Sequence, residues 1–237
     1  LTEKSSSACR AYFSLPIWLF DRHHSWKAKN IPWAGRKSLR NKGRKNIRAM
    51  AHKNDYQIQK QLDKPQTWFC KYYPARIRNV GEKEIADRQL VFDFKDGRAY
   101  EEVAQRTAEN MLTLYGKGCV NIVFAPVPAS TSESNELRYK AFCHRVCELT
   151  GAENGYEHVR VCGERKTIHD NRKNEDEVRK ANVVEFDEPF FDNKMVLVFD
   201  DVITKGLSYA KYANQLERLG AFVIGGMFLA RTHYKVR

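Results

Sequence analysis

The sequence predicts an α/β protein, built from a mainly parallel β-sheet with helices on its faces. Two observations predict this class: apolar runs of strand length recur between residues 119 and 229, and segments with helical spacing of apolar residues separate them. The chain has 237 residues, of which 42% are hydrophobic and 30% are charged. This composition excludes wholesale disorder and fibrous repeats, and the length suits one sizeable domain with an appendage, or at most two small domains.

The first elements follow a polar lead-in at residues 53–64. Residues 68–74 are rich in aromatic side chains, and we interpret residues 89–94, four of which are apolar, as a strand that ends at Lys95, Asp96 and Gly97. Tyr100–Tyr115 carries apolar or small side chains at helical spacing, which predicts a helix that ends at the glycines after it.

The middle of the chain continues the alternation. Residues 119–127 are almost entirely apolar, as expected of a strand buried on both faces, and residues 136–149 are predicted to be helical. Residues 158–161 are predicted to form a short strand. Residues 163–181 include 11 charged side chains among 19 residues and almost no apolar anchor, so we expect a mobile loop there.

The last third of the body holds two further apolar runs, residues 195–199 and 222–229, which we expect to be strands. Between them, Ser208 is placed to cap a helix that Gly220 ends. The side chains expected on the inner face of this helix are Tyr209, Tyr212, Ala213, Leu216 and Leu219. Ligands of parallel sheets bind beyond the carboxyl ends of the strands, which directs attention to the residues that follow these runs.

Positive charge is concentrated at the start of the chain. Residues 1–49 hold 12 Lys or Arg against two acidic residues, whereas the rest holds 29 against 27. Three interpretations stay open for this segment: a start site placed too far upstream of Met50, a disordered tail, or a basic arm that binds nucleic acid. We favour the first because the composition changes at Met50, so the net charge of +12 is not used as evidence for a nucleic-acid partner.

The sequence indicates neither a membrane protein nor a disulfide scaffold. The longest apolar stretches, residues 11–20 and 221–230, are about half the length that a membrane-spanning helix needs. The six cysteines include no Cys-x-x-Cys pair, and we expect Cys143 and Cys147 to pack in the core rather than to bind a metal. We therefore expect a cytosolic protein that does not associate with membranes.

One segment combines side chains suited to binding a sugar phosphate. Asp200 and Asp201 follow an apolar strand, and two adjacent carboxylates there can accept hydrogen bonds from vicinal hydroxyl groups. The loop of residues 204–208 contains a glycine and leads into a helix, so its N–H groups and hydroxyls can hold a phosphate, with Lys205 adding positive charge. The alternative, an ordinary strand with two solvated acids, is disfavoured because carboxylates beside so apolar a strand are costly without a partner.

The segment resembles the phosphoribosyl pyrophosphate (PRPP) signature of type I phosphoribosyltransferases: four apolar residues, two acids, an apolar pair, then Thr-x-Gly-x-Ser/Thr. Looser similarities to the ComF-like subgroup extend over more than half of the chain. They are Phe124-Ala-Pro-Val-Pro128, the region of Arg138, Arg165-Lys-Thr167, the later Arg179-Lys-Ala-Asn-Val183 and Phe94-Lys-Asp-Gly97. The four-cysteine zinc ribbon that usually begins ComF-like proteins is missing from this sequence.

The resemblance implies a fold and a division of the chain. The fold would be that of type I phosphoribosyltransferases, a mainly parallel sheet flanked by helices with a small hood. Residues 1–49 would be a basic non-globular extension, residues 50–88 a lead-in that includes the hood, and residues 89–237 the phosphoribosyltransferase-like domain.

The resemblance also implies a role for each part of the site. Asp200 and Asp201 would be the catalytic pair, holding the ribose hydroxyls. The residues expected to hold the 5′-phosphate are Thr204, Lys205, Gly206, Leu207 and Ser208. Those expected to face pyrophosphate are Val127, Pro128, Ala129, Ser130 and Arg138, joined by Arg165 and Lys166 when the mobile loop closes. Mg²⁺ would be bound mainly through PRPP, without metal ligands of the protein's own.

The function implied is transfer of ribose 5-phosphate from PRPP to an unidentified nitrogen acceptor, with release of pyrophosphate. The alternative is a PRPP-binding regulator, or a ComF-like accessory protein that handles nucleic acid, without turnover. The acceptor and the oligomeric state are left open, a homodimer being one option. A side chain added at Gly206 is expected to impair ligand affinity more than stability.

Overall fold

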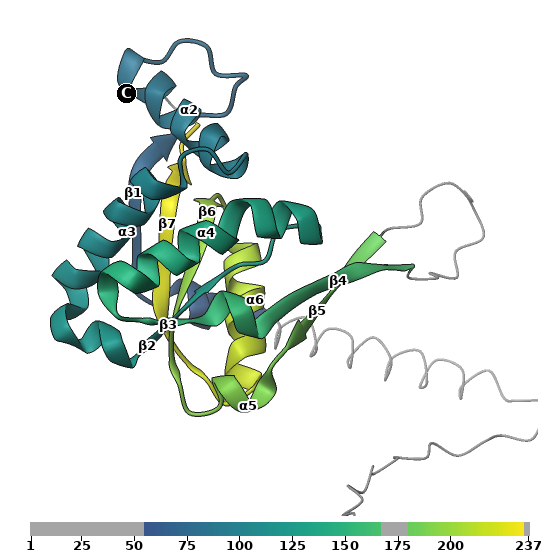
Figure 1. Ribbon diagram of the computed structural model, residues 1–237. Coiled ribbons are helices and arrows are strands. Elements are labelled where there is room, and N and C mark those ends of the chain that lie inside the picture. The colour runs from purple at the N-terminus through teal and green to yellow at the C-terminus, as the bar shows by residue number, and fades with distance from the viewer. Residues whose placement is uncertain (1–54, 167–179, 235–237) are drawn as a thin grey trace, which may run out of the picture. The chain divides into compact units, whose positions relative to one another are not determined.

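The computed structural model describes residues 55–166 and 180–234 (Figure 1). In residues 163–166 and 180–182 it describes the backbone alone.

The chain divides into two units, Leu1–Arg48 and Ala49–Arg237, and every described residue belongs to the second. The basic segment 1–49 and the loop residues 167–179, for which the sequence suggested an extension and a mobile loop, lie outside the described residues. No helix in the described part of the chain is long and apolar enough to cross a membrane.

Five parallel strands form the main sheet, in the order β1-β7-β6-β2-β3 (Figure 1). The strands are β1 (Gln66–Tyr72), β2 (Ile122–Pro126), β3 (Glu153–Asn154), β6 (Met195–Ile203) and β7 (Phe222–Thr232). All five residues of β2 are buried, as expected of a strand covered on both faces. The predicted α/β class with a parallel sheet is confirmed.

Helices cover both faces of this sheet. On one face lie α2 (Glu82–Lys95), α3 (Tyr100–Tyr115) and α4 (Ser132–Thr150), whose apolar side chains pack on Phe124, Leu197 and Phe199. On the other face lie α6 (Leu207–Arg218), the short α5 (Glu188–Phe191) and helical residues 55–62, which pack on Val123, Val196 and Val198. The bounds predicted for α3 from its helical spacing are confirmed.

A second, two-stranded sheet consists of β4 (Val159–Lys166) and β5 (Lys180–Phe186), which are antiparallel. The predicted strand at 158–161 was too short and the predicted loop at 163–181 too long, because both strands continue into that segment. Cross-strand backbone hydrogen bonds hold such a pair together without an alternating apolar pattern. Two 3₁₀ helices, Gly116–Asn121 and Gly155–His158, precede β2 and β4.

One sequence prediction for this part of the chain needs correction. Residues 89–94, predicted as a strand, lie in α2, where Val91 and Phe94 are buried three residues apart, the spacing of one helix face. Residues 68–72 belong to β1, which pairs with β7 at the edge of the main sheet. The lead-in therefore contributes a strand to the sheet.

Strand β6 is longer than predicted. It runs past residues 195–199, through Asp200 and Asp201, and ends at Ile203. Pairing with β7 continues along this extension, where Asp200 lies opposite Phe228. The two acids are thus strand residues, and successive side chains of a strand point to opposite faces.

The chain leaves the neighbouring strands β2 and β6 in opposite directions. From β2 it passes through α4 to β3 at one edge, and from β6 it passes through α6 to β7 on the other side. Such a divergence leaves a crevice beyond the carboxyl ends of the two strands, which is where open α/β sheets bind ligands. The segments that follow the strands here are residues 127–131 and 204–206.

Aromatic side chains pack beneath this edge of the sheet. The cluster contains Phe94, Phe124, Tyr139, Phe142 and Phe199. The ring centroids of Phe142 and Phe199 are 4.6 Å apart, and those of Phe94 and Phe142 are 5.0 Å apart. Pairs of this kind each contribute about 0.5–1.5 kcal/mol beyond the burial of area. Because Phe199 directly precedes Asp200, the cluster fixes the position of the acids.

Candidate functional site

A hollow of about 290 Å³ lies where β6 passes into α6. Its lining residues are Asp200, Val202, Ile203, Thr204, Lys205, Gly206, Leu207, Ser208 and Tyr209. We call this hollow the β6 pocket. The whole predicted phosphate loop and one of the two predicted acids therefore share one concave surface, at the edge of the sheet that the topology indicates.

The conformation of Gly206 sets the start of α6. Its φ of 69° and ψ of 11° lie in the left-handed region that favours glycine, and its carbonyl oxygen accepts the N–H of Ala210 at 2.9 Å. The predicted cap by Ser208 is wrong, because Ser208 lies inside the first turn and the N-cap position belongs to Gly206. With no side-chain cap, the N–H groups of the first turn stay available to an anion.

Side chains of the same loop are accessible from the pocket. Thr204, Lys205, Leu207 and Ser208 are exposed, so an ammonium group and hydroxyls accompany the N–H groups of the helix start. The hydroxyls of Thr204 and Thr232 are hydrogen-bonded at 2.7 Å, which ties the loop to the end of β7.

The two adjacent acids have different surroundings. Asp200 is half-buried and lines the β6 pocket. Asp201 is buried, and its Oδ2 lies 2.6 Å from Arg138 Nη1 and 3.8 Å from Lys95 Nζ. The helices α2 and α4 cover one face of the sheet and α6 covers the other. The Asp201 carboxylate therefore lies on the face of α2 and α4, and the Asp200 carboxylate lies on the face of α6.

The position of Asp200 favours its protonated form. Burial, together with the negative charge of Asp201, raises the pKa of Asp200 to about 8. Its Oδ1 accepts the N–H of Asp201 at 2.9 Å, and the Arg138 and Lys95 cations also favour the ionised form, so they offset part of that rise. A carboxyl in this state can donate a hydrogen bond as well as accept one.

The loop after β2, predicted to face pyrophosphate, uses much of its own hydrogen-bonding capacity. The Val127 N–H donates to Phe199 O at 2.7 Å, and the Ala129 N–H donates to Asn135 Oδ1 at 2.9 Å. Pro128 has no N–H to donate. Of the four loop residues predicted to face pyrophosphate, only Ser130 is exposed. This loop offers an incoming anion fewer backbone donors than the resemblance implies.

The predicted cations differ in how they are placed. Arg138 lies on α4 and is paired with Asp201. Arg165 and Lys166 lie at the end of β4, opposite Ala181 and Lys180 of β5, and only their backbone is described.

Sequence reasoning missed several contributors to the site. Lys95 stood in a quoted motif, but nothing local indicated that it would lie beside Asp201. Asn135 was not singled out, although its buried amide holds Ala129. The hydroxyl of Tyr139 is buried without a hydrogen-bond partner among the described residues, and burial, reinforced by Asp201 and Asp200, raises its pKa. Tyr139 therefore keeps its proton.

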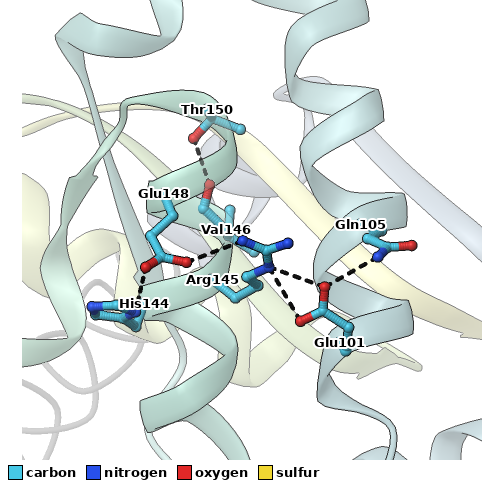
Figure 2. A network of polar contacts seen from close by, with 7 residues as sticks. All are labelled: Glu101, Gln105, His144, Arg145, Val146, Glu148 and Thr150. Carbon is cyan, nitrogen blue, oxygen red and sulfur yellow. Dashed lines mark hydrogen bonds and ion pairs between the residues drawn. The ribbon is translucent and has the colours of Figure 1, made fainter.

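A second hollow, of about 520 Å³, lies between α3 and α4. Its charged groups pair with one another: Arg145 Nε lies 3.0 Å from Glu101 Oε1, and Arg145 Nη1 lies 3.1 Å from Glu148 Oε2 (Figure 2). Gln105 also donates to Glu101, at 3.0 Å. This network ties two helices together and leaves little charge for a ligand, so the β6 pocket is the stronger candidate site.

No family model matches the chain, and no curated protein matches it significantly. The chemistry and geometry of the β6 pocket are therefore the guide to its ligand.

Proposed function

We propose that the protein binds PRPP with Mg²⁺ in the β6 pocket and transfers ribose 5-phosphate to a nitrogen acceptor, releasing pyrophosphate. The observation that carries this proposal is the juxtaposition of Asp200 with the loop of residues 204–208 in one hollow. A carboxylate and a phosphate-binding helix start, side by side, match the two ends of a ribose 5-phosphate.

The 5′-phosphate occupies the loop. Backbone N–H groups at the start of α6 point at it, and the positive end of the helix dipole favours its charge. Lys205 and the hydroxyls of Thr204 and Ser208 add donors at the rim. Gly206 supplies the left-handed conformation, with a φ of 69°, that turns the chain from the loop into α6.

The ribose lies against Asp200. Its carboxyl accepts hydrogen bonds from the sugar hydroxyls and, when ionised, stabilises the positive charge that develops on the ring as the bond to pyrophosphate breaks. Catalysis of this kind consists of positioning and electrostatic stabilisation, because the leaving group takes the electron pair and the acceptor nitrogen supplies another.

The site is compatible with Mg²⁺ carried by the substrate. Asp200 places one carboxyl on the pocket wall. Mg²⁺ usually keeps several waters and substrate phosphate oxygens as ligands, so one nearby carboxylate suffices. When bound, it would neutralise charge on the diphosphate.

A second candidate function is PRPP binding without turnover. The ion pair between Asp201 and Arg138 favours it, because the second acid of the motif is then not free to contact the reacting sugar. A binding protein needs only the phosphate loop and Asp200.

Calorimetric titration with PRPP and Mg²⁺, followed by assays of pyrophosphate release with a panel of nitrogen acceptors, tests the proposal. Lys205→Gln should weaken PRPP binding, and Lys211→Gln, an exposed change on the helix that follows the loop, should not. Release of pyrophosphate with one acceptor supports the transferase, binding without release supports the second candidate, and no binding by the wild type contradicts both.

A further inference from the structure

Three charged groups from three elements meet at Asp201, the residue that follows the pocket-lining Asp200. Lys95 comes from the last turn of α2, Arg138 from α4 and Asp201 from β6. Both cations converge on one carboxylate oxygen, Asp201 Oδ2, at 2.6 Å for Arg138 and 3.8 Å for Lys95. Two cations facing one carboxylate leave an excess of positive charge that a further anion can balance.

The tight turn after α2 fixes the place of Lys95. Gly97 has a φ of 74°, and a Cβ built on it would lie 2.7 Å from the backbone oxygen of Leu137. Only glycine fits so close an approach without displacement. The turn thus rests on α4 next to Arg138 and keeps Lys95 within reach of the same ligand.

Neither cation is fully satisfied by Asp201. Lys95 lies beyond hydrogen-bond distance of the carboxylate, and its side chain is 36% exposed, so a ligand can reach it. Arg138 is more enclosed: its Nε is buried without a hydrogen-bond partner among the described residues, and 18% of its side chain is exposed to a ligand. The cluster therefore retains donor capacity.

We propose that Lys95 joins Arg138, the cation that the resemblance already assigns to pyrophosphate, in binding the diphosphate of the substrate, and that Asp201 is a positioning residue, which holds these two cations in place. This inference rests on the proposed function. It also explains how an anion can be bound although the loop after β2 offers few donors, since the N–H groups of Val127 and Ala129 donate to Phe199 and Asn135. Side-chain cations take over the anion contacts that the loop does not supply.

Asp200 and Asp201 then have different roles. Asp200 contacts the ribose on the pocket side of the sheet, and Asp201 acts on the substrate only through Lys95 and Arg138. The resemblance to phosphoribosyltransferases implies instead that both acids hold the sugar, so the two accounts make different predictions.

Calorimetric titrations with three probes separate these accounts: PRPP with Mg²⁺, inorganic pyrophosphate with Mg²⁺, and ribose 5-phosphate. Lys95→Gln should weaken binding of PRPP and pyrophosphate roughly tenfold or more, the loss of one charge-assisted contact, and leave ribose 5-phosphate unchanged. Lys95→Arg should retain most of the affinity. Lys140→Gln, an exposed change on the helix that carries Arg138, is the control and should change none of the three.

The acids provide the second arm. Asp201→Asn should weaken pyrophosphate and spare ribose 5-phosphate, whereas Asp200→Asn should weaken ribose 5-phosphate and spare pyrophosphate. Adding Asp201→Asn to Lys95→Gln should cost less than the sum of the two changes. If the wild type binds all three probes and Lys95→Gln binds pyrophosphate normally, the inference is overturned and the proposed function stands. A wild type that binds none of them overturns both.

Discussion

The guanidinium of Arg138 and the carboxylate of Asp201 lie 2.6 Å apart and join α4 to β6 across 63 residues of the chain. Both side chains are largely shielded from solvent, with 18% and 10% of their surfaces exposed. Asp200, the residue before Asp201, instead accepts a hydrogen bond from the Asp201 N–H. Neighbouring carboxylates are thus held in opposite electrostatic situations, one paired with a cation and one disfavoured as an anion.

Neutralising Asp201 and neutralising Asp200 should therefore change the free energy of unfolding in opposite directions. Asp201→Asn should destabilise the protein by about 3 kcal/mol, because it leaves Arg138 buried without its partner. Asp200→Asn should stabilise the protein by about 1 kcal/mol at pH 8, because the amide carries no charge that must be buried beside Asp201. Chemical denaturation of the two variants beside the wild type measures both effects.

The pH dependence of stability tests whether the effect of Asp200→Asn comes from the ionisation of Asp200. Folding raises its pKa from the ordinary 3.8 to about 8, so the protonated form favours the folded state. That contribution is complete below pH 4 and is lost as the pH rises towards 8. The melting temperature of Asp200→Asn should exceed that of the wild type increasingly between pH 5 and pH 8, and a constant difference would contradict the assignment.

Gly206→Ala should reduce stability as well as ligand binding. The residue has a φ of 69°, and a Cβ there would lie 2.5 Å from Leu62 Cδ2. Strain and overpacking together should cost roughly 1–3 kcal/mol. The sequence alone suggested a loss mainly of affinity, and the contact with Leu62 changes that expectation.

Two variants separate the causes of the Gly206 effect in thermal unfolding. Adding Leu62→Ala to Gly206→Ala should remove the clash and leave the backbone strain, so it should relieve the overpacking part of the loss. Lys205→Thr, one residue away on an exposed side chain, should leave stability unchanged. Equal melting temperatures for Gly206→Ala and the wild type would refute the close contact.

Asn135→Ala should loosen the loop after β2. The Asn135 side chain is 6% exposed, and its oxygen accepts the Ala129 N–H at 2.9 Å. Loss of that acceptor leaves a shielded donor unpaired, which should cost about 1–3 kcal/mol in urea unfolding. Asn135→Asp keeps an acceptor and should cost less; a variant pair of equal stability would argue against this role.

Arg145→Met should have only a small effect. Arg145 forms exposed ion pairs with Glu101 of α3 and with Glu148 of its own helix (Figure 2), so their loss should cost about 0.2–1 kcal/mol and less in concentrated salt. Unfolding in urea at low and high salt measures this. A cost as large as that of Asp201→Asn would mean that the network between the helices is structurally decisive.

Local pattern predicted much of the fold. Tyr100–Tyr115 was placed correctly because its apolar residues follow one helix face over four turns. Residues 89–94 were misassigned because a six-residue segment with four apolar side chains fits a strand or a half-buried helix equally well, and the packing of Val91 and Phe94 decides for the helix. The extension of β6 through its two acids was missed because pairing with β7 overrides their low strand propensity.

The candidate site was predictable only where it is contiguous. The loop of residues 204–208 and Asp200 line one pocket, as the motif indicated. The partners of Asp201 come from α2 and α4, and Leu62 reaches Gly206 from the lead-in. Such contacts depend on how distant elements pack, and a single sequence carries no local signal for them.

A crystal structure with PRPP and Mg²⁺ tests the central claim most directly. The account predicts the 5′-phosphate within 2.7–3.2 Å of N–H groups in residues 206–208, a distance typical of hydrogen bonds. It also predicts the ribose hydroxyls at Asp200 and the diphosphate towards Lys95 and Arg138. A ligand bound elsewhere, for example between α3 and α4, or a β6 pocket that stays empty at saturating PRPP, would contradict it.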